Sequence, residues 1–377
     1  QRLTSPTVKL RIPTGDSNDG STDSGSGTAS PKVNRVMLGQ ATLSMPVFSG
    51  FRLKNSVAAS EDLYKAETLN AASTKEQLAL QAIMLYVNLY KAQQSVTLIQ
   101  ESLKSAGQRV KDFTAMEQNG LLARNDLLKA QLQSSSIELS LEDAKRRVST
   151  VNYQLVTLLK LPEGTEIMPD ASYFNKPQGS GSVVTADEAM AQRSDLEALR
   201  WQQKASEANI GIAKAGYYPS VSLMAGYVAL DIQNLVQVYN AANFGVGLSY
   251  DIASIFKNGN KVKEAQSRAD ESRKAVELLS DQVKVQVHEA AENYNLAIKQ
   301  DRVYTEAVTQ ANENFRIVKD KYDNGLVDTN DLLEADVQQL QARLDEAFSK
   351  ADITQRYFEL LNAAGKLTQS FNLTQNK

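Results

Sequence analysis

The side chains best suited to chemistry are carboxylates beside a short turn in the C-terminal half. Asp331 and Glu334 are three residues apart in a segment with helical periodicity, so they share one face of the predicted helix. Asp126 takes the place of Asp331 in a similar, earlier segment. Carboxylates stacked around a pore attract cations and repel anions. The alternative for Asp126 and Asp331 is that an acid near a helix start only favours the helix dipole.

Other chemistry has little support in the sequence. The chain has no cysteine, which excludes disulfides, thiol catalysis and cysteine-ligated metals. His288 is the only histidine, and its neighbours Val287 and Glu289 build neither a metal cluster nor a catalytic dyad. With no nucleophile or phosphate loop either, we expect no enzymatic activity, no metal and no cofactor. The net charge of −3 gives no electrostatic footprint for nucleic acid.

The acidic segments belong to an internal repeat. Residues 117–130 read EQNGLLARNDLLKA, and residues 322–335 read YDNGLVDTNDLLEA. One spacing relates every matching pair, which indicates a duplicated plan. An Asn-Gly pair between two helical segments is typical of a tight turn. The repeat therefore predicts two hairpin tips, formed by Asn119, Gly120 and Leu121 and by Asn324, Gly325 and Leu326.

Long heptad patterns flank both tips. Helices are predicted over residues 50–118 and about 260–321, and within them apolar residues follow alternating steps of four and three from Leu78 to Phe113 and from Val283 to Val318, as they also do beyond the first tip. This spacing predicts supercoiled seams, and the short connections make the paired helices antiparallel neighbours. An aromatic content of only 7% suits such narrow seams better than a thick globular core.

Strand patterns precede each pair of long helices. Residues 7–12 and 37–47 alternate apolar and polar side chains and predict a first β-hairpin, joined by a solvated polar loop over residues 14–31. Residues 217–257 repeat this pattern as a second β-hairpin. The predicted organisation is a first hairpin with an extracellular loop (1–49), a coiled-coil hairpin (50–160), a linker or equatorial segment (161–185), a helix (186–216), a second β-hairpin (217–257), a second coiled-coil hairpin (258–367) and a tail (368–377).

Four strands cannot close a barrel, and an open apolar sheet in water would expose its edges. Association of several chains solves this problem and gives a β-barrel continuous with an α-helical tube. In a membrane the apolar strand face would meet lipid, while the polar, glycine-rich face would line a water-filled bore. The alternative is a soluble sheet packed on helices. No apolar run approaches the roughly 18 residues of a membrane-spanning helix.

The sequence resembles the TolC-like outer-membrane efflux channels. The resemblance rests on the duplicated plan, on AKAGYYPSVSLMAGY opening a strand (213–227), on LSMPVFSG before a helix (43–50) and on the two tips. Members of that family have a helix before the first strand, which we expect this chain to lack. The family's proline-phenylalanine-glycine motif is present as Pro46, Phe48 and Gly50, whereas the second half reads DIASIFKNGN (251–260).

The resemblance implies a mainly α protein with membrane strands. Three chains would form a twelve-stranded β-barrel continuous with a coiled-coil α-helical barrel, in the outer membrane of a Gram-negative bacterium and reaching far into the periplasm. The implied function is a passive exit duct of a tripartite efflux or type I secretion system. The implied partners are two further copies, a periplasmic adaptor protein, an inner-membrane pump and outer-membrane lipid.

The resemblance also implies roles for the tip residues. Both NGL tripeptides would dock adaptor hairpins, and Asp331, Glu334 and Asp126 would line a periplasmic gate. Tyr322 matches a gate tyrosine whose basic partner in relatives is replaced here by Val327, and Arg124 of the other tip is a possible substitute.

A soluble coiled-coil adaptor or scaffold is the alternative function. An adaptor would have one helical hairpin and compact β modules, so the duplicated strand pairs favour the channel.

Overall fold

The structure is a computed structural model that describes residues 2–3, 6–10, 33–174, 185–233 and 235–371. Two compact units divide the chain. Unit 1 comprises residues 1–65 and 200–274, and unit 2 comprises residues 66–199 and 275–377. The predicted loop over residues 14–31 lies outside the described residues, as does most of the C-terminal tail.

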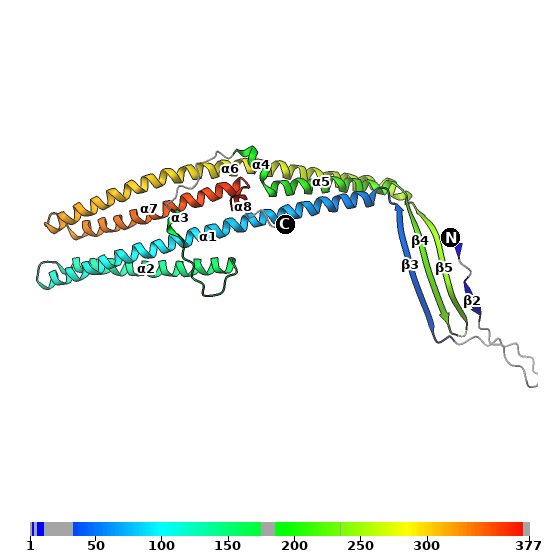
Figure 1. The fold of residues 1–377 in the computed structure, drawn as a ribbon, viewed down its shortest axis with the longest axis horizontal. Coiled ribbons are helices and arrows are strands. Elements are labelled where there is room, and N and C mark those ends of the chain that lie inside the picture. The colour runs from blue at the N-terminus through cyan, green and yellow to red at the C-terminus, as the bar shows by residue number, and fades with distance from the viewer. Residues whose placement is uncertain (1, 4–5, 11–32, 175–184, 234, 372–377) are drawn as a thin grey trace, which may run out of the picture. The chain divides into compact units, whose positions relative to one another are not determined.

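Unit 1 contains an antiparallel sheet of five strands (Figure 1). The strands are β1 (Arg2–Leu3), β2 (Thr7–Leu10), β3 (Val36–Phe48), β4 (Ser220–Ile232) and β5 (Val236–Ser249). The order across the sheet is β1-β5-β4-β3, and β2 also pairs with β5. The long strand β3 and the line of β1 and β2 are therefore the two edges.

The pairing confirms the second predicted hairpin and corrects the first. β4 and β5 pair along almost their whole lengths, with Ser220 opposite Ser249 and Ile232 opposite Val236. β2 does not pair with β3: Thr7 lies opposite Tyr239, and β3 pairs with β4 instead. β3 pairs on one side with β4 and its other side stays an open edge, while β2 adds to the outer side of β5, a partner far along the chain that local alternation does not reveal.

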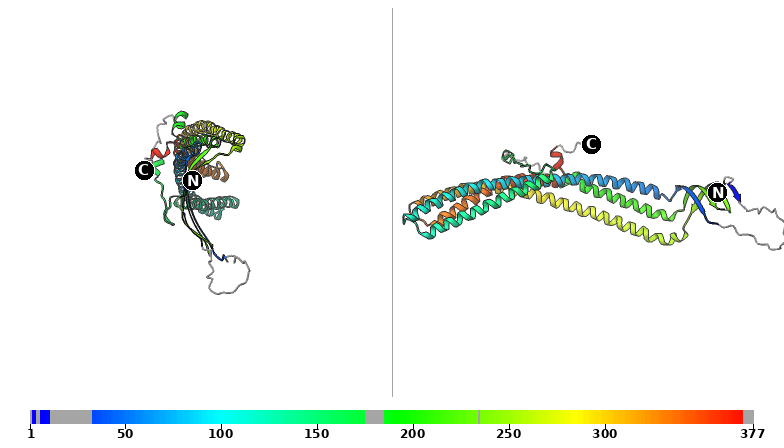
Figure 2. Two further views of the ribbon diagram at one scale, coloured as in Figure 1. Left: turned by 90° about the vertical axis from the view of Figure 1, so that its right-hand side faces the viewer. Right: turned by 90° about the horizontal axis from the view of Figure 1, so that it is seen from below.

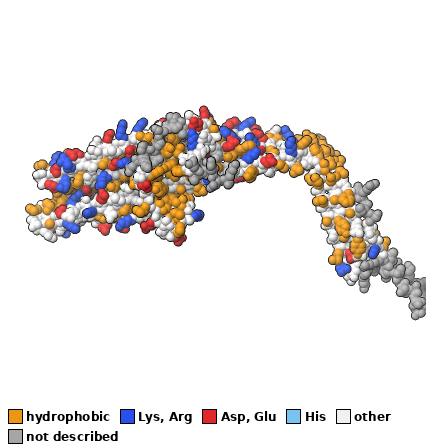
Figure 3. Space-filling view, viewed as in Figure 1, with side chains coloured by type: hydrophobic (Ala, Val, Ile, Leu, Met, Phe, Trp, Pro, Cys, Tyr) orange, Lys and Arg blue, Asp and Glu red, His pale blue; other side chains and the backbone are white. Residues whose placement is uncertain are grey.

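One face of the sheet is apolar and the other is mostly polar. The apolar side chains are exposed, as Leu43 (71%) and Val246 (70%) illustrate, and they are visible over the strands in Figure 3. Two adjacent rows of cross-strand partners on this face are Leu43–Ala225–Phe244 and Met45–Leu223–Val246. The opposite face carries Gln40, Thr42, Ser44, Ser222, Asn243, Gly245 and Gly247, with Met224 among them. The predicted alternation is thus retained in the pairing register.

Two different junctions connect the strands to the helices of unit 1. After β3, Gly50 and Phe51 both have left-handed backbone angles (φ 63° and 66°) before α1 (Arg52–Gln118) begins. The ring of Phe51 packs edge-on against Phe48 and Tyr218, at centroid distances of 5.6 and 6.2 Å. These contacts offset the strain of a non-glycine residue in this conformation. After β5 the helix α6 (Ile252–Asp323) begins almost at once, about eight residues earlier than the sequence pattern predicted.

Unit 2 is built on four long helices: parts of α1 and α6, with α2 (Arg124–Leu158) and α7 (Thr329–Ala363). Figure 2 shows them running side by side. Seam positions predicted from the heptads are buried, including Leu89, Ala106, Leu127 and Leu141, although Leu78 is 48% exposed. Short helices complete this unit: α3 (Ala171–Phe174), α4 (Ala186–Gln192) and α8 (Leu367–Ser370). Among the described helices, none has a stretch long and apolar enough to cross a membrane.

The helix predicted over residues 186–216 is interrupted. α4 ends before Arg193, whose backbone is extended (ψ 117°), and α5 (Ser194–Lys214) follows, with a final 3-10 turn at Ala215–Tyr217. At the break the chain lies against Gly365. Its left-handed backbone (φ 68°) brings it so close to Arg193 that an added Cβ would lie 3.1 Å from the Arg193 Cα. This tertiary contact has no signature in the local pattern.

The turn at Gly50 gives a first testable prediction. We expect Gly50→Ala to lower the free energy of unfolding by about 2 kcal/mol or more, because a left-handed alanine alone costs about 1–2 kcal/mol. In addition, the new Cβ would lie 2.6 Å from the carbonyl oxygen of Ala215. Gly107→Ala is the matched control: that glycine lies inside α1, and no atom lies within 4 Å of the place that a methyl group would take, so helix propensity should stabilise this variant by up to about 1 kcal/mol. Denaturant unfolding followed by circular dichroism compares the two, and equal stability would contradict the tight turn.

Candidate functional site: the paired helical tips

The two tips have the same backbone geometry. Gly120 and Gly325 end their helices in the left-handed conformation, with φ of 73° and 71°. In each tip the glycine N–H donates to the carbonyl three residues back and the next N–H donates to the carbonyl five residues back, over 2.8–2.9 Å. This pair of hydrogen bonds defines the Schellman motif at a helix C-terminus, and glycine is favoured there because it has no Cβ. The predicted turn chemistry is therefore present in both repeats.

The residue after each glycine is unusually exposed. A Schellman end commonly packs this residue back against its own helix. Here Leu121 and Leu326 are both 73% exposed. The preceding asparagines are also exposed, but each is held against its own helix, since Asn119 and Asn324 donate from Nδ2 to a carbonyl four residues back at 2.7 Å. Each tip thus presents one leucine side chain to its surroundings.

The helices that follow the two tips, α2 and α7, begin differently. Asp328 caps α7, and its Oδ1 accepts hydrogen bonds from the backbone N–H groups of Asn330 (2.8 Å) and Asp331 (3.1 Å). In the first repeat Ala123 is the N-cap of α2 and provides no side-chain bond. A side-chain cap stabilises a helix start by about 1 kcal/mol. The second tip is therefore the more firmly fixed of the two at this point.

An apolar cluster joins the first tip to the second within one chain. Its buried members are Phe113, Leu127, Ala130 and Leu332. The ring of Tyr322 packs against it, stacked on Phe113 with a centroid distance of 5.8 Å. Leu127 and Leu332 are equivalent positions of the repeat, so the duplicated apolar residues meet at one seam.

The four predicted gate residues lie at this end of unit 2, and two of them are exposed. Asp331 and Glu334 are exposed on α7, where Glu334 accepts a hydrogen bond from Gln338 at 3.1 Å. Asp126 is partly buried and accepts one from Lys129 at 3.3 Å. Arg124 pairs with Glu117 over 3.5 Å, so within the chain it is not the partner of Tyr322. No group of three or more potential metal ligands occurs among the described residues.

A buried ion pair behind the tips was not predicted from the sequence. Arg109 of α1 donates to Asp336 of α7 at 3.0 Å, and the two side chains are only 12% and 8% exposed. Gln133 of α2 joins them, donating from Nε2 to the carbonyl of Leu333 (3.3 Å) and to Asp336 (3.4 Å). Its Oε1 is buried and accepts no hydrogen bond in the described part of the chain. These three residues, Arg109, Gln133 and Asp336, form the latch network, which ties the first helical hairpin to the second.

Further polar contacts connect α1 to α7 away from the tips. Arg343 pairs with Glu101 at 2.9 Å, and Lys91 pairs with Asp352 at 2.5 Å. Lys350, in the same part of α7, donates to Glu346 at 2.8 Å, and this bond raises the pKa of the Lys350 ammonium group. The first two pairs are more exposed than Arg109 and Asp336, so the latch network contains the pair of charges most removed from solvent.

The burial of the latch network gives a second prediction. Breaking a buried ion pair on one side costs about 3–5 kcal/mol, whereas replacing both charges with apolar residues is often neutral. We therefore expect Arg109→Leu and Asp336→Leu each to lower stability strongly and the double variant to recover most of the loss. The exposed pair Arg316–Asp320 (2.8 Å) is the control, because removing such a pair costs about 0–1 kcal/mol. Denaturant unfolding of the unmodified protein, the two single variants and the double variant gives the coupling energy of the pair. If the losses of unfolding free energy simply add in the double variant, the two charges are not coupled.

Comparisons with known proteins agree with this architecture. Residues 6–159 and 185–366 match the family described as "Outer membrane efflux protein". The outer membrane efflux protein BepC of Brucella suis biovar 1 is 21% identical over 86% of this chain and 71% of its own. The outer membrane protein TolC of Vibrio cholerae is 22% identical over 79% of this chain and 70% of its own.

Solved structures show the same fold. The chain is similar to CusC with a TM-score of 0.75 and 18% identity, over 97% of this chain and 83% of the other. It is similar to the outer membrane protein VceC of Vibrio cholerae with a TM-score of 0.71 and 16% identity, over 88% and 87%. The resemblance predicted from the sequence is confirmed, together with the outer-membrane location and the role as an efflux duct. Since the family match covers both halves of the repeat, this chain belongs to the outer membrane efflux protein family.

Proposed function

We propose that three copies of this chain form the exit duct of a tripartite efflux or type I secretion system, gated at the periplasmic tips. The observation that carries this proposal is the sheet of unit 1, which has an exposed apolar face, a polar opposite face and two free edges. Such a sheet is stable where lipid covers the apolar face and neighbouring chains cover the edges.

The strand order supports a closed assembly of three chains. Each chain offers four strand positions: β3, β4, β5 and the shared line of β1 and β2. Three chains give 3 × 4 = 12 positions, and joining the β3 edge of one copy to the β1–β2 edge of the next removes every free edge. A barrel of this kind places apolar side chains outward and polar ones inward. The polar face with Thr42, Ser222 and Asn243 would then line the bore.

The tips would form the periplasmic gate of the duct. Asp331 and Glu334 are exposed on the same helix face, three residues apart, and three copies would arrange them as two acidic rings. Asp126 and Tyr322 lie on the same tips. Opening the gate requires the two hairpins of each chain to separate at the seam of Phe113 and Leu332.

The latch network is suited to hold that seam closed. It crosses from α1 and α2 to α7 just behind the apolar cluster. Separating the hairpins would expose Arg109 and Asp336 to water, which restores their hydration but removes a 3.0 Å charge-assisted hydrogen bond. A buried ion pair of this kind contributes to a single defined arrangement more than to net stability.

The exposed leucines support adaptor docking at the tips. Leu121 and Leu326 offer the same side chain in the same local geometry, as a partner with repeated contact elements would require. The proposed partners are a periplasmic adaptor at the tips and, through it, an inner-membrane pump. The alternative of a soluble adaptor or scaffold is set aside because the family match includes the strands of both halves.

Conductance tests the proposed duct. The full-length protein, purified from membranes in detergent, should elute as a trimer and conduct ions in planar lipid bilayers. A water-soluble monomer that gives no conductance would overturn the proposal.

The acidic rings give a third prediction. Replacing both acids, as Asp331→Asn with Glu334→Gln, should lower the permeability ratio of K⁺ to Cl⁻ by about twofold or more, because the rings attract cations. Glu306→Gln is the matched control: it removes an exposed carboxylate from α6 away from the tips. Reversal potentials in a salt gradient measure both variants. If the double variant and the control have the same ratio as the unmodified protein, the two acids do not line the gate.

Docking gives a fourth prediction, which the lack of native cysteines makes simple to test. The glycines of the tips are poor positions for labels because their left-handed backbone disfavours any side chain. Leu121→Cys and Leu326→Cys are better placed, and each should crosslink to a candidate adaptor in cells. Ser135→Cys, an exposed and nearly isosteric change on α2, is the control that should not crosslink. Equal crosslinking from all three positions would contradict docking at the tips.

A further inference from the structure

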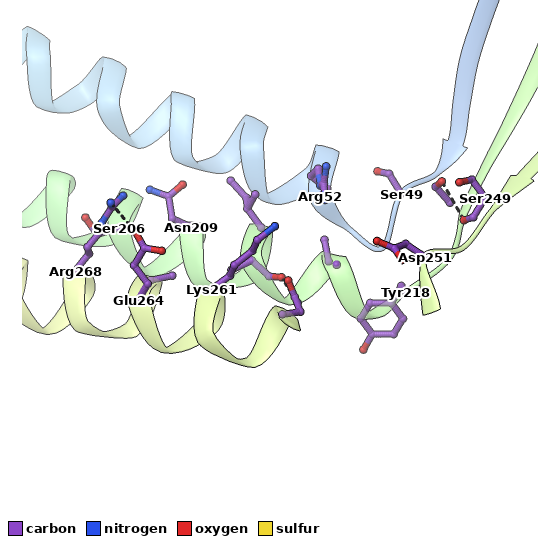
Figure 4. A pocket seen from close by; sticks show the side chains of 17 residues that line it. Ser49, Arg52, Ser206, Asn209, Tyr218, Ser249, Asp251, Lys261, Glu264 and Arg268 are labelled. Atoms are coloured by element: carbon purple, nitrogen blue, oxygen red, sulfur yellow. Dashed lines mark hydrogen bonds and ion pairs between the residues drawn. The ribbon is translucent and has the colours of Figure 1, made fainter. Parts of the chain in front are cut away.

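A hollow of about 810 Å³ lies in unit 1 where the strands meet the helices (Figure 4). Side chains from the first turns of α1, from α5 and from the early part of α6 surround it. Its walls combine polar groups, such as Ser49 and Asn209, with apolar ones, such as Ile212 and Ala213. A solute with both an apolar body and a polar group fits such a lining.

The charges around this hollow are not balanced. Three cations line it, Arg52, Lys261 and Arg268, together with the acids Asp251 and Glu264. Arg268 is neutralised by Glu264 at 2.7 Å, and Asp251 accepts a hydrogen bond from the backbone N–H of Ala253 (3.0 Å) at the start of α6. Arg52 and Lys261 form no ion pair or side-chain hydrogen bond with any described residue. Arg52 and Lys261 therefore border one space together with the carboxylate of Asp251, and the lining charges sum to 3 − 2 = +1.

The hollow continues the polar face of the sheet. Ser220 and Ser249 line it, and they are cross-strand partners at the ends of β4 and β5. Because strand residues alternate between faces, these serines share a face with Ser222 and Gly247, the next such pair along the strands. If this face lines the bore, as the proposed function requires, the hollow opens into the bore and not toward lipid.

The donors present suit an oxyanion. The guanidinium group of Arg52 is a planar, multiple donor that matches carboxylate, phosphate and sulfate, and the Lys261 ammonium adds a compact positive charge. Asn209 contributes an amide that forms no hydrogen bond with another described residue. Figure 4 shows it between α1, which carries Arg52, and α6, which carries Lys261. The neighbouring first turn of α1 contains no acidic residue that would oppose an anion.

We propose that this hollow is an oxyanion-binding site in the bore, which holds solutes bearing a carboxylate, phosphate or sulfate group. The proposal rests on the proposed function for its exposure to the bore, and it adds a solute class that the acidic tips do not indicate. Three chains would place three such sites at the level where the strands end. The site carries the opposite charge to the acids at the tips.

The test uses the full-length protein in detergent and planar bilayers. Binding is measured by ³¹P NMR line broadening with inorganic phosphate and with phenyl phosphate, and anion selectivity is measured by reversal potentials. The double variant Arg52→Gln with Lys261→Gln should weaken phosphate binding by about tenfold or more, since two charged donors are lost. It should also shift selectivity away from anions.

The control is Lys54→Gln with Lys263→Gln, which removes one exposed lysine from each of the same two helices outside the hollow. This control variant should bind phosphate as tightly as the unmodified protein does. Each single variant at Arg52 and Lys261 is measured as well, so that the result stands if the double variant does not assemble. Tighter binding of phenyl phosphate than of inorganic phosphate assigns the site to organic solutes, and equal binding assigns it to the free anion.

The outcomes separate this inference from the proposed function. If the unmodified protein does not conduct, the duct itself is wrong. The oxyanion site is overturned, and the duct stands, if the unmodified protein conducts but binds neither phosphate compound. The same holds if the double variant of Arg52 and Lys261 and the control variant of Lys54 and Lys263 lose phosphate binding equally.

Discussion

The alternation of apolar and polar side chains along β3, β4 and β5 is the constraint on which the rest of the structure depends. The pairing register keeps apolar partners such as Leu43, Ala225 and Phe244 in one row, so the sheet cannot be solvated on that face without a large cost. The two free edges add a second cost, because their backbone donors and acceptors need partners. Both costs disappear together when lipid covers one face and further chains cover the edges.

The helical repeat is symmetrical in backbone and asymmetrical in its polar contacts. Both tips have the same glycine conformation and the same asparagine hydrogen bonds. By the spacing that relates the tips, however, Arg109 and Asp336 correspond to Asn314 and Gln131. Only one of the two equivalent seams therefore carries a buried charge pair. In a ring of copies, the seam within each chain would carry this ion pair, whereas the equivalent position between chains would carry two neutral side chains, so the two seams would respond differently to a force that opens the ring.

Local chemistry was predictable from the sequence, and contacts between distant residues were not. The tips, the long helices and the β4–β5 pair follow from Asn-Gly turns, heptads and alternation, which act over a few residues. The position of β2 beside β5, the break at Arg193 and the latch network depend on partners far away in the chain. Arg109 and Asp336 are 227 residues apart, and in a heptad each is an ordinary charged position. The roles of Asp331, Glu334 and the tip leucines stay predictions, because one chain does not contain the ring in which they would act.

The junction after β5 connects a departure from the family motif to the hollow in unit 1. The first junction, which contains the proline-phenylalanine-glycine motif, makes the left-handed turn of Gly50 and Phe51. The second lacks that motif and instead starts α6 directly, with Asp251 accepting from the N–H of Ala253. Because no turn intervenes, the first turns of α6 lie beside the strand ends, and Lys261 reaches the same space as Arg52 of α1. The segment that departs from the family motif therefore contributes Asp251 and Asn258 to the hollow and is followed directly by its cation Lys261.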